Sequence, residues 1–182
     1  MRLLLDRGAQ VRLPKGSGAP LFGATALGLS AMSGNADMIP QLLAKGDRLD
    51  DQFITLGSIP QNPLINTISF DDPDTLAALL KAGLRVDLAD EGGVTLLDQA
   101  VINGRPEIAR LLISRGANVN AVDKLGMTPL LYAASIDFGD SSMIDLLIKS
   151  GANTKARSKE NLTALDLARK YGEMDLVARL SR

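Results

Sequence analysis

The fold is decided by residues 90–120, which contain T-L-L-D-Q-A-V-I-N-G from Thr95 to Gly104 and L-L-I-S-R-G-A-N-V-N from Leu111 to Asn120. Both segments recur along the chain. Versions of the first are separated by 37, 33, 33 and 35 residues and open at Thr25, Asn62, Thr95, Thr128 and Thr163. Versions of the second follow the first four of these openers and end at Gly46, Gly83, Gly116 and Gly151. A period near 33 residues indicates an array of repeated structural units.

Each unit has the pattern of two helices. Small or apolar residues follow the opener at helical spacing, as in Leu130, Ala133 and Ala134. A second apolar face comes after a short break, as in Ile108 and Leu112. The glycine after that face is predicted to end the second helix in a left-handed conformation. One such unit cannot bury its apolar face alone, so successive units are predicted to stack into a solenoid.

The period, the T-P-L-L-Y-A-A opening at Thr128 and the leucine pair before glycine resemble the ankyrin repeat. The resemblance implies an all-α, ankyrin-like helical-repeat solenoid of helix-turn-helix units joined by hairpin-like loops. It implies a single domain over residues 1–182, with a half-repeat at 1–12 and repeats at about 20–50, 57–87, 90–120, 123–155 and 158–182. Because the half-repeat lacks a first helix, we expect the chain to be cut from a longer protein or to begin at an internal methionine.

The histidine of the usual repeat motif is missing from every unit. Its position is held by Gly28, Ile65, Asp98, Leu131 and Asp166. The resemblance implies a hydrogen-bonding role at this position, linking neighbouring turns. Asp98 and Asp166 could bond locally instead, whereas the side chains of the other three could not.

Several prolines and aspartates predict where helices begin. Asp72 is expected to cap a helix with Pro73 at its first position, and Pro106 is expected to open another helix in the same way. Pro40 falls within a second helix, where an interior proline costs about 3 kcal/mol. We therefore predict that this helix starts late, with Asp37 as its cap and Pro40 in its first turn. A kink is the alternative.

The composition excludes most catalytic chemistry. The chain has no cysteine and no histidine, which removes disulfides, the common zinc sites and His-dependent nucleophiles. The lysine of residues 15–23 precedes the glycines, unlike that of a phosphate-binding loop. The aspartates at 71, 72 and 74 lack the spacing of a calcium loop, so helix capping explains them better. We therefore predict a chain that is not an enzyme and has no metal and no cofactor.

The charge balance argues against nucleic acid as a general partner. Twenty basic and 21 acidic residues give a net charge of -1, and aromatic residues make up 3% of the chain. No apolar run approaches the length that crosses a bilayer. We expect a monomeric cytoplasmic protein that binds neither nucleic acid nor membrane. One basic cluster near the C-terminal end is either a solvated surface or a dock for an acidic peptide or, weakly, nucleic acid: Lys149, Lys155, Arg157, Lys159, Arg169 and Lys170.

The resemblance implies a partner on the concave side, which is built from the hairpin-like tips and the exposed ends of the first helices. An apolar row exposed there would mark an interface. The candidate partner-binding residues are Phe22, Met32, Phe70, Glu91, Ile102, Lys124, Leu125, Ile136, Phe138, Lys170 and Tyr171. Met32, Ile102 and Ile136 could instead be ordinary core. The longer connectors at 9–24, 47–61 and 137–142 are expected to be exposed loops, which often lie at a binding face.

These patterns predict a non-catalytic protein–protein interaction module that binds a partner protein on its concave face. Short stacked helices form a rigid surface, which loses little conformational entropy on binding. The alternative is a regulatory or scaffolding segment that acts in cis within a larger enzyme or channel.

Overall fold

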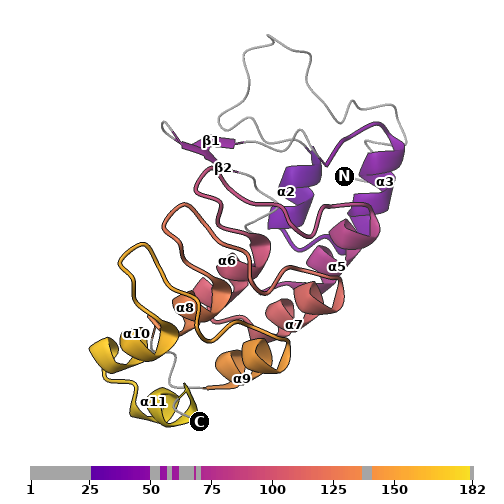
Figure 1. The fold of residues 1–182 in the computed structure, drawn as a ribbon. Helices are drawn as coiled ribbons and strands as arrows, with labels where there is room; N and C mark the ends of the chain where they lie inside the picture. The colour runs from indigo at the N-terminus through magenta and orange to yellow at the C-terminus, as the bar shows by residue number, and fades with distance from the viewer. Residues whose placement is uncertain are drawn as a thin grey trace. The chain divides into compact units, whose positions relative to one another are not determined.

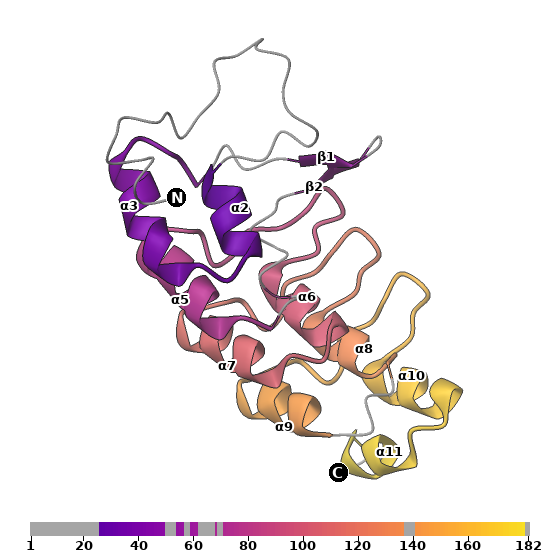
Figure 2. The same ribbon diagram turned by 180° about the vertical axis from the view of Figure 1, so that it is seen from behind.

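The computed structural model describes residues 26–49, 54–56, 59–61, 68, 71–136 and 141–180 (Figures 1 and 2). These residues fall into two compact units, 1–85 and 86–182, and each is described by itself. The fold is the predicted all-α helical-repeat solenoid, with one short two-stranded ribbon added to it. The predicted repeat boundaries stay a prediction. The predicted half-repeat 1–12, the connector 9–24 and Ile65 lie outside the described residues, as do residues 137–140 of the third connector.

The first unit contains helices packed in pairs. Helix α2 (Ala26–Met32) packs against the 3-10 turn η1 (Ala36–Met38) and helix α3 (Ile39–Ala44), and both of these pack against helix α5 (Pro73–Lys81). The buried Asp47 holds the start of α2, because its Oδ2 accepts a hydrogen bond of 2.9 Å from the Leu27 N–H.

The connector between α3 and α5 contains the ribbon. Strand β1 (Ile54–Leu56) pairs antiparallel with strand β2 (Ile59–Gln61), and Leu56 lies opposite Ile59. The sequence analysis predicted extra length here but not paired strands.

The prediction for Pro40 is partly confirmed. Helix α3 begins at Ile39, and Pro40 lies in its first turn. The prediction that Asp37 caps this helix is wrong, because Asp37 lies inside η1 and the N-cap residue is Met38, with no side-chain bond. The N–H groups of Met38 and Ile39 already donate to the carbonyls of Asn35 and Ala36, so no free donor remains there for a carboxylate.

The second unit has two rows of helices (Figures 1 and 2). The first row consists of α6 (Leu96–Ile102), α8 (Pro129–Ala133) and α10 (Ala164–Tyr171), each packed on the next. The second row contains α7 (Pro106–Ser114) and α9 (Ser142–Lys149), and α11 (Met174–Leu180) pairs with α10. An exposed ion pair between Arg179 and Asp145 joins α11 to α9.

The core of this unit lies between the two rows. Its fully buried side chains include Leu96, Ile108, Leu112, Leu130 and Leu147. Burying each of these stabilises the fold by about 1.5–3 kcal/mol. Small residues such as Ala100, Ala134 and Ala168 are also buried and let successive first-row helices approach closely.

The helix starts and ends confirm most of the local predictions. Asp72 caps α5 through a 2.9 Å bond from the Thr75 N–H to its Oδ1, and Pro73 and Pro106 open their helices. Asp98 and Asp166 do bond locally, each forming a capping box with the threonine three residues before it. The predicted left-handed glycines have φ of 95°, 102°, 90° and 91° at Gly46, Gly83, Gly116 and Gly151.

Neighbouring repeats are also tied by one asparagine. The side chain of Asn120 donates to the Gly151 carbonyl at 3.0 Å and accepts from the Asn153 N–H at 2.7 Å. Both bonds span more than 30 residues of chain. They fix the spacing between two repeats where the second helices end.

Candidate partner-binding site

Three hairpins precede the first-row helices of the second unit, at residues 90–94, 123–127 and 158–162. Each is closed by a backbone hydrogen bond of 3.0 Å from the N–H of its first residue to the carbonyl of its last. The exposed tip residues are Glu91, Lys124, Leu125, Lys159 and Glu160, of which the first three are candidate partner-binding residues from the sequence. We call these five residues the tip row.

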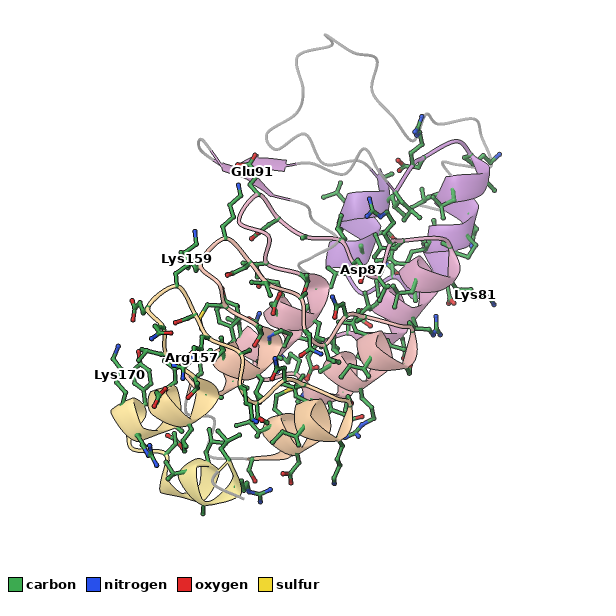
Figure 3. The ribbon with its side chains drawn as sticks, in the orientation of Figure 1. Lys81, Asp87, Glu91, Arg157, Lys159 and Lys170 are labelled. Atoms are coloured by element: carbon green, nitrogen blue, oxygen red, sulfur yellow. The ribbon has the colours of Figure 1, made fainter. Side chains whose placement is uncertain are left out.

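The tip row is a continuous structure held by backbone hydrogen bonds. The Lys124 N–H donates to the Gly92 carbonyl at 2.8 Å, and the Lys159 N–H donates to the Leu125 carbonyl at 3.0 Å. Since each hairpin is bonded to the next, the tips are ordered before any partner arrives. Figure 3 shows Glu91 and Lys159 projecting outward from their hairpins.

An aspartate shapes each of the first two hairpins. Asp90 Oδ1 accepts from the N–H groups of Gly92 and Val94 at 2.8 and 2.9 Å. Asp123 Oδ1 accepts from Leu125 and Met127 at 2.8 and 2.7 Å in the same way. Short side chains of this kind stabilise tight turns by bonding to the backbone two to four residues on. These aspartates therefore position the tip row.

A tyrosine joins the second hairpin to its helix. Tyr132, on α8, donates its hydroxyl to Asp123 Oδ2 at 2.5 Å. Burial and this bond to a carboxylate raise the pKa of the Tyr132 hydroxyl above its ordinary range. The hydroxyl therefore stays a donor, and the link between hairpin and helix persists across neutral pH.

The carboxyl pKa values of the two capping-box aspartates, Asp98 and Asp166, are shifted in opposite directions. Asp98 has no exposed surface, and burial raises its pKa to about 6, although two bonds from Thr95 act in the other direction. Its Oδ1 is buried without a hydrogen-bond partner, and the charges of Asp123 and Asp90 raise the pKa further. For Asp166, the bonds from Thr163 and then the nearby arginines lower the pKa. Burial, not the capping geometry, makes the difference.

The end of α10 adds an aromatic side chain beside a cluster of basic residues. Tyr171 is 53% exposed, and the Lys170 ammonium lies 5.6 Å from the centre of its ring, within cation–π range. Arg157 donates to the Asn161 carbonyl at 2.7 Å. Figure 3 shows Arg157, Lys159 and Lys170 along one edge of the second unit.

The predicted apolar row is only partly present as an exposed row. Ile102 and Ile136 are half-buried, between the two alternatives that their sequence pattern allowed. Met32 ends α2, and nothing is described of its side chain, while Phe22, Phe70 and Phe138 lie outside the described residues. Among the candidates with described side chains, the large exposed apolar ones are Leu125 (65%) and Tyr171.

Among the described residues, two large exposed apolar side chains were not predicted from the sequence. Val122 is 64% exposed and immediately precedes the hairpin aspartate, and Leu29 is 49% exposed on α2. The exposure of Val122 could have been predicted from its position directly before Asp123, because an aspartate that opens a tight turn marks a segment outside the core. Leu29 follows Gly28 inside a helical pattern and has no such marker.

Neither a metal-binding group of acidic side chains nor a membrane-spanning helix is present in the described part of the chain. Within it, no three Asp or Glu side chains are grouped so that they could hold a metal ion. None of its helices is both long enough and apolar enough to span a bilayer.

Comparison with known proteins agrees with the architecture. The family profile described as "Ankyrin repeats (many copies)" matches residues 68–113 and 97–148. The mouse B-cell lymphoma 3 protein homolog is 35% identical over 60% of this chain and 25% of its own length. Human ankyrin repeat domain-containing protein 63 is 30% identical over 66% of this chain and 33% of its own. The glycerophosphocholine phosphodiesterase gde1 of Schizosaccharomyces pombe is 30% identical over 86% of this chain and 14% of its own.

The chain spans no more than a third of the length of these three relatives. The likeness therefore concerns the repeats and not the whole of each protein. Ankyrin repeats are protein-interaction modules, which fits stacked helices that carry an ordered row of exposed tips. The recurring two-helix units, the hydrogen-bonded hairpins and the matching family profile together show that this chain belongs to the ankyrin-repeat family.

Proposed function

We propose that this chain is a non-catalytic protein-interaction module whose partner protein lies on the concave side, against the tip row and the end of α10. The observation that carries the proposal is the hydrogen-bonded tip row, which presents the exposed Leu125 in a fixed position. A surface that is ordered beforehand loses little entropy on binding. The proposal also takes the chain to act as a monomer in the cytoplasm.

The exposed apolar side chains supply the expected affinity. Burying Leu125 or Tyr171 under a partner contributes about 1.5–3 kcal/mol each. Large anchors surrounded by polar groups commonly dominate a protein interface. In the tip row Leu125 follows Lys124, and its carbonyl accepts a hydrogen bond from the Lys159 N–H, so both lysines are its neighbours. An apolar centre with a polar rim is therefore present at this surface.

Affinity capture from the lysate of the source organism tests the proposal. The variant Leu125→Asp/Tyr171→Asp is expected to lose at least roughly tenfold in the amount of partner retained, because charged groups replace both anchors. The matched control is Ser114→Asp/Ala178→Asp, which adds the same two charges at exposed positions on α7 and α11.

All three proteins should first show the same helical content and melting temperature. A partner retained by the parent and the control but lost by the test variant supports the proposal. A partner retained equally by all three would place the interface elsewhere. Loss from both variants would show that added charge alone abolishes binding.

A second function is favoured by one comparison. The fission yeast relative named as a phosphodiesterase matches this chain over only 14% of its own length. Such a repeat array could act in cis, as a regulatory or scaffolding segment beside a catalytic domain. Failure of capture, together with a coding sequence that joins this chain to a catalytic domain, would favour this function over the first.

A further inference from the structure

The surface around the third hairpin and α10 carries an excess of positive charge. Residues 151–172 contain five basic residues (Lys155, Arg157, Lys159, Arg169, Lys170) and two acidic ones (Glu160, Asp166), although the whole chain has 20 basic and 21 acidic residues. Lys124 at the tip of the second hairpin adds a further exposed cation. The positive charge is thus concentrated on one part of a nearly neutral chain.

Little of this charge is neutralised among the residues that the structure describes. The carboxylate of Asp166 already accepts hydrogen bonds from the N–H and the hydroxyl of Thr163, at 2.9 and 2.7 Å. The other acidic residue of the segment is Glu160. In the part of the chain that the structure describes, Lys124, Lys159 and Lys170 form no ion pair with a carboxylate. Their ammonium groups are exposed and available to a partner.

The exposed apolar side chains lie beside these same cations. Leu125 follows Lys124, and its carbonyl holds the Lys159 backbone at 3.0 Å. Tyr171 follows Lys170, whose ammonium lies 5.6 Å from the ring centre. Each anchor therefore has a lysine next to it, in a surface fixed by the hairpin hydrogen bonds.

We propose that the partner contributes an acidic peptide segment with large apolar side chains, whose carboxylates pair with Lys124, Lys159 and Lys170. Its apolar side chains cover Leu125 and Tyr171. This rests on the proposed function and names the class of partner. The first hairpin carries Glu91 and no lysine, so the segment lies over the second and third tips, where Lys124 and Lys159 outweigh Glu160, and over α10.

Nucleic acid fits this surface less well. Glu160 stands in the same row as the lysines and would repel the evenly spaced phosphates of a nucleic acid, whereas a peptide can place an uncharged residue opposite it. Among the described residues of this surface Tyr171 alone presents an aromatic face, and Leu125, the most exposed large apolar side chain, offers none on which a base could stack. A peptide in which acidic residues alternate with leucine or phenylalanine matches both the lysines and the exposed apolar side chains.

A display library of random linear peptides tests the proposal. Peptides are selected on the parent chain, on Lys159→Glu/Lys170→Glu, and on the matched control Arg115→Glu/Lys149→Glu, which reverses two exposed cations at the ends of α7 and α9. A random single-stranded oligonucleotide library is selected in parallel.

We expect the parent to enrich acidic peptides with large apolar residues. Their binding should fall at least roughly tenfold on the test variant, stay near the parent level on the control, and weaken with added salt. Enrichment of neutral or basic peptides, equal binding to both variants, or a preference for oligonucleotides would overturn the proposal.

The same experiment separates this inference from the proposed function. If no peptide is enriched but a captured protein still depends on Leu125 and Tyr171, the acidic segment is wrong and the interaction surface stands. If capture also shows no dependence on these two residues, the proposed function fails as well.

Discussion

Replacing Gly126 with alanine is expected to lower the free energy of unfolding by roughly 3 kcal/mol, from two additive causes. Gly126 has φ of 74°, a left-handed conformation that costs an ordinary residue about 1–2 kcal/mol. A Cβ at this position would also lie 2.8 Å from the backbone nitrogen of Lys159. That nitrogen donates the bond joining the second and third hairpins, so the clash also weakens the tip row.

Substitutions at Gly116 separate the two causes. Gly116 also has a left-handed φ, of 90°, but a Cβ there would meet nothing within 4 Å. Gly116→Ala should therefore cost only the strain, about 1–2 kcal/mol, and Gly116→Val more than about 1 kcal/mol. Asparagine tolerates the left-handed conformation. Asn161, which holds the place in the third hairpin that Gly126 holds in the second, has φ of 62°.

Replacing Gly116 and Gly126, each in turn, with asparagine gives the sharpest comparison. Gly116→Asn should be nearly neutral, whereas Gly126→Asn should remain destabilising because its Cβ still meets Lys159. Urea unfolding followed by circular dichroism measures each difference. Equal effects of asparagine at the two positions would show that the second and third hairpins are not packed as closely as described.

Asp98→Asn is expected to raise the free energy of unfolding at pH 7 by up to about 3 kcal/mol and to change it little near pH 4. Burial raises the pKa of Asp98 to about 6, so the native state holds this proton where the unfolded chain has released it. The contribution of Asp98 to stability is therefore complete below about pH 4 and is lost as the pH rises to about 6. Asparagine cannot ionise and removes that loss.

Asp166→Asn is the matched control, because Asp166 forms the same capping box but is only half-buried, whereas Asp98 is fully buried. The pKa of its carboxyl is lowered, so the charged form stabilises the fold and its contribution disappears as the pH falls. The control should thus gain no stability at neutral pH. Urea unfolding of the parent and both variants at several pH values between 4 and 8 tests this. A difference between the parent and Asp98→Asn that stays constant across this range would contradict the assignment.

The repeat pattern predicted the fold because its signals are local. Thr95, Pro106 and Gly116 each act within one or two turns of chain, so their spacing alone marks where two helices begin and end. The local bonds of Asp98 and Asp166 were predictable for the same reason, since capping boxes connect residues three apart.

The features that escaped prediction depend on competition between neighbours. Asp37 resembles a cap in sequence, but the turn at Ala36–Met38 satisfies the nearby N–H groups with carbonyls instead. The ribbon at Ile54–Gln61 pairs two short strands that have no repeat equivalent. The opposite pKa changes of Asp98 and Asp166 depend on burial, which the shared capping motif does not encode.

The sequence predicted where the candidate site lies better than it predicted which side chains are exposed there. Hairpin tips follow from the repeat register, so Glu91, Lys124 and Leu125 were found directly. The exposure of the candidate residues at or just after the end of each first-row helix depends on how deeply that helix is packed. Ile102 and Ile136 are half-buried for that reason, whereas Tyr171 is exposed at the end of α10.

Amide hydrogen exchange, measured on the chain alone and with its captured partner, tests the central claim most directly. The account predicts that the partner slows exchange at residues 123–127 and 158–162 and at the end of α10, with no change in α7 and α9. It also predicts that the Lys124 and Lys159 amides exchange slowly in the chain alone, since both are already hydrogen-bonded. Protection confined to α7 and α9, with the three hairpins unaffected, would contradict it.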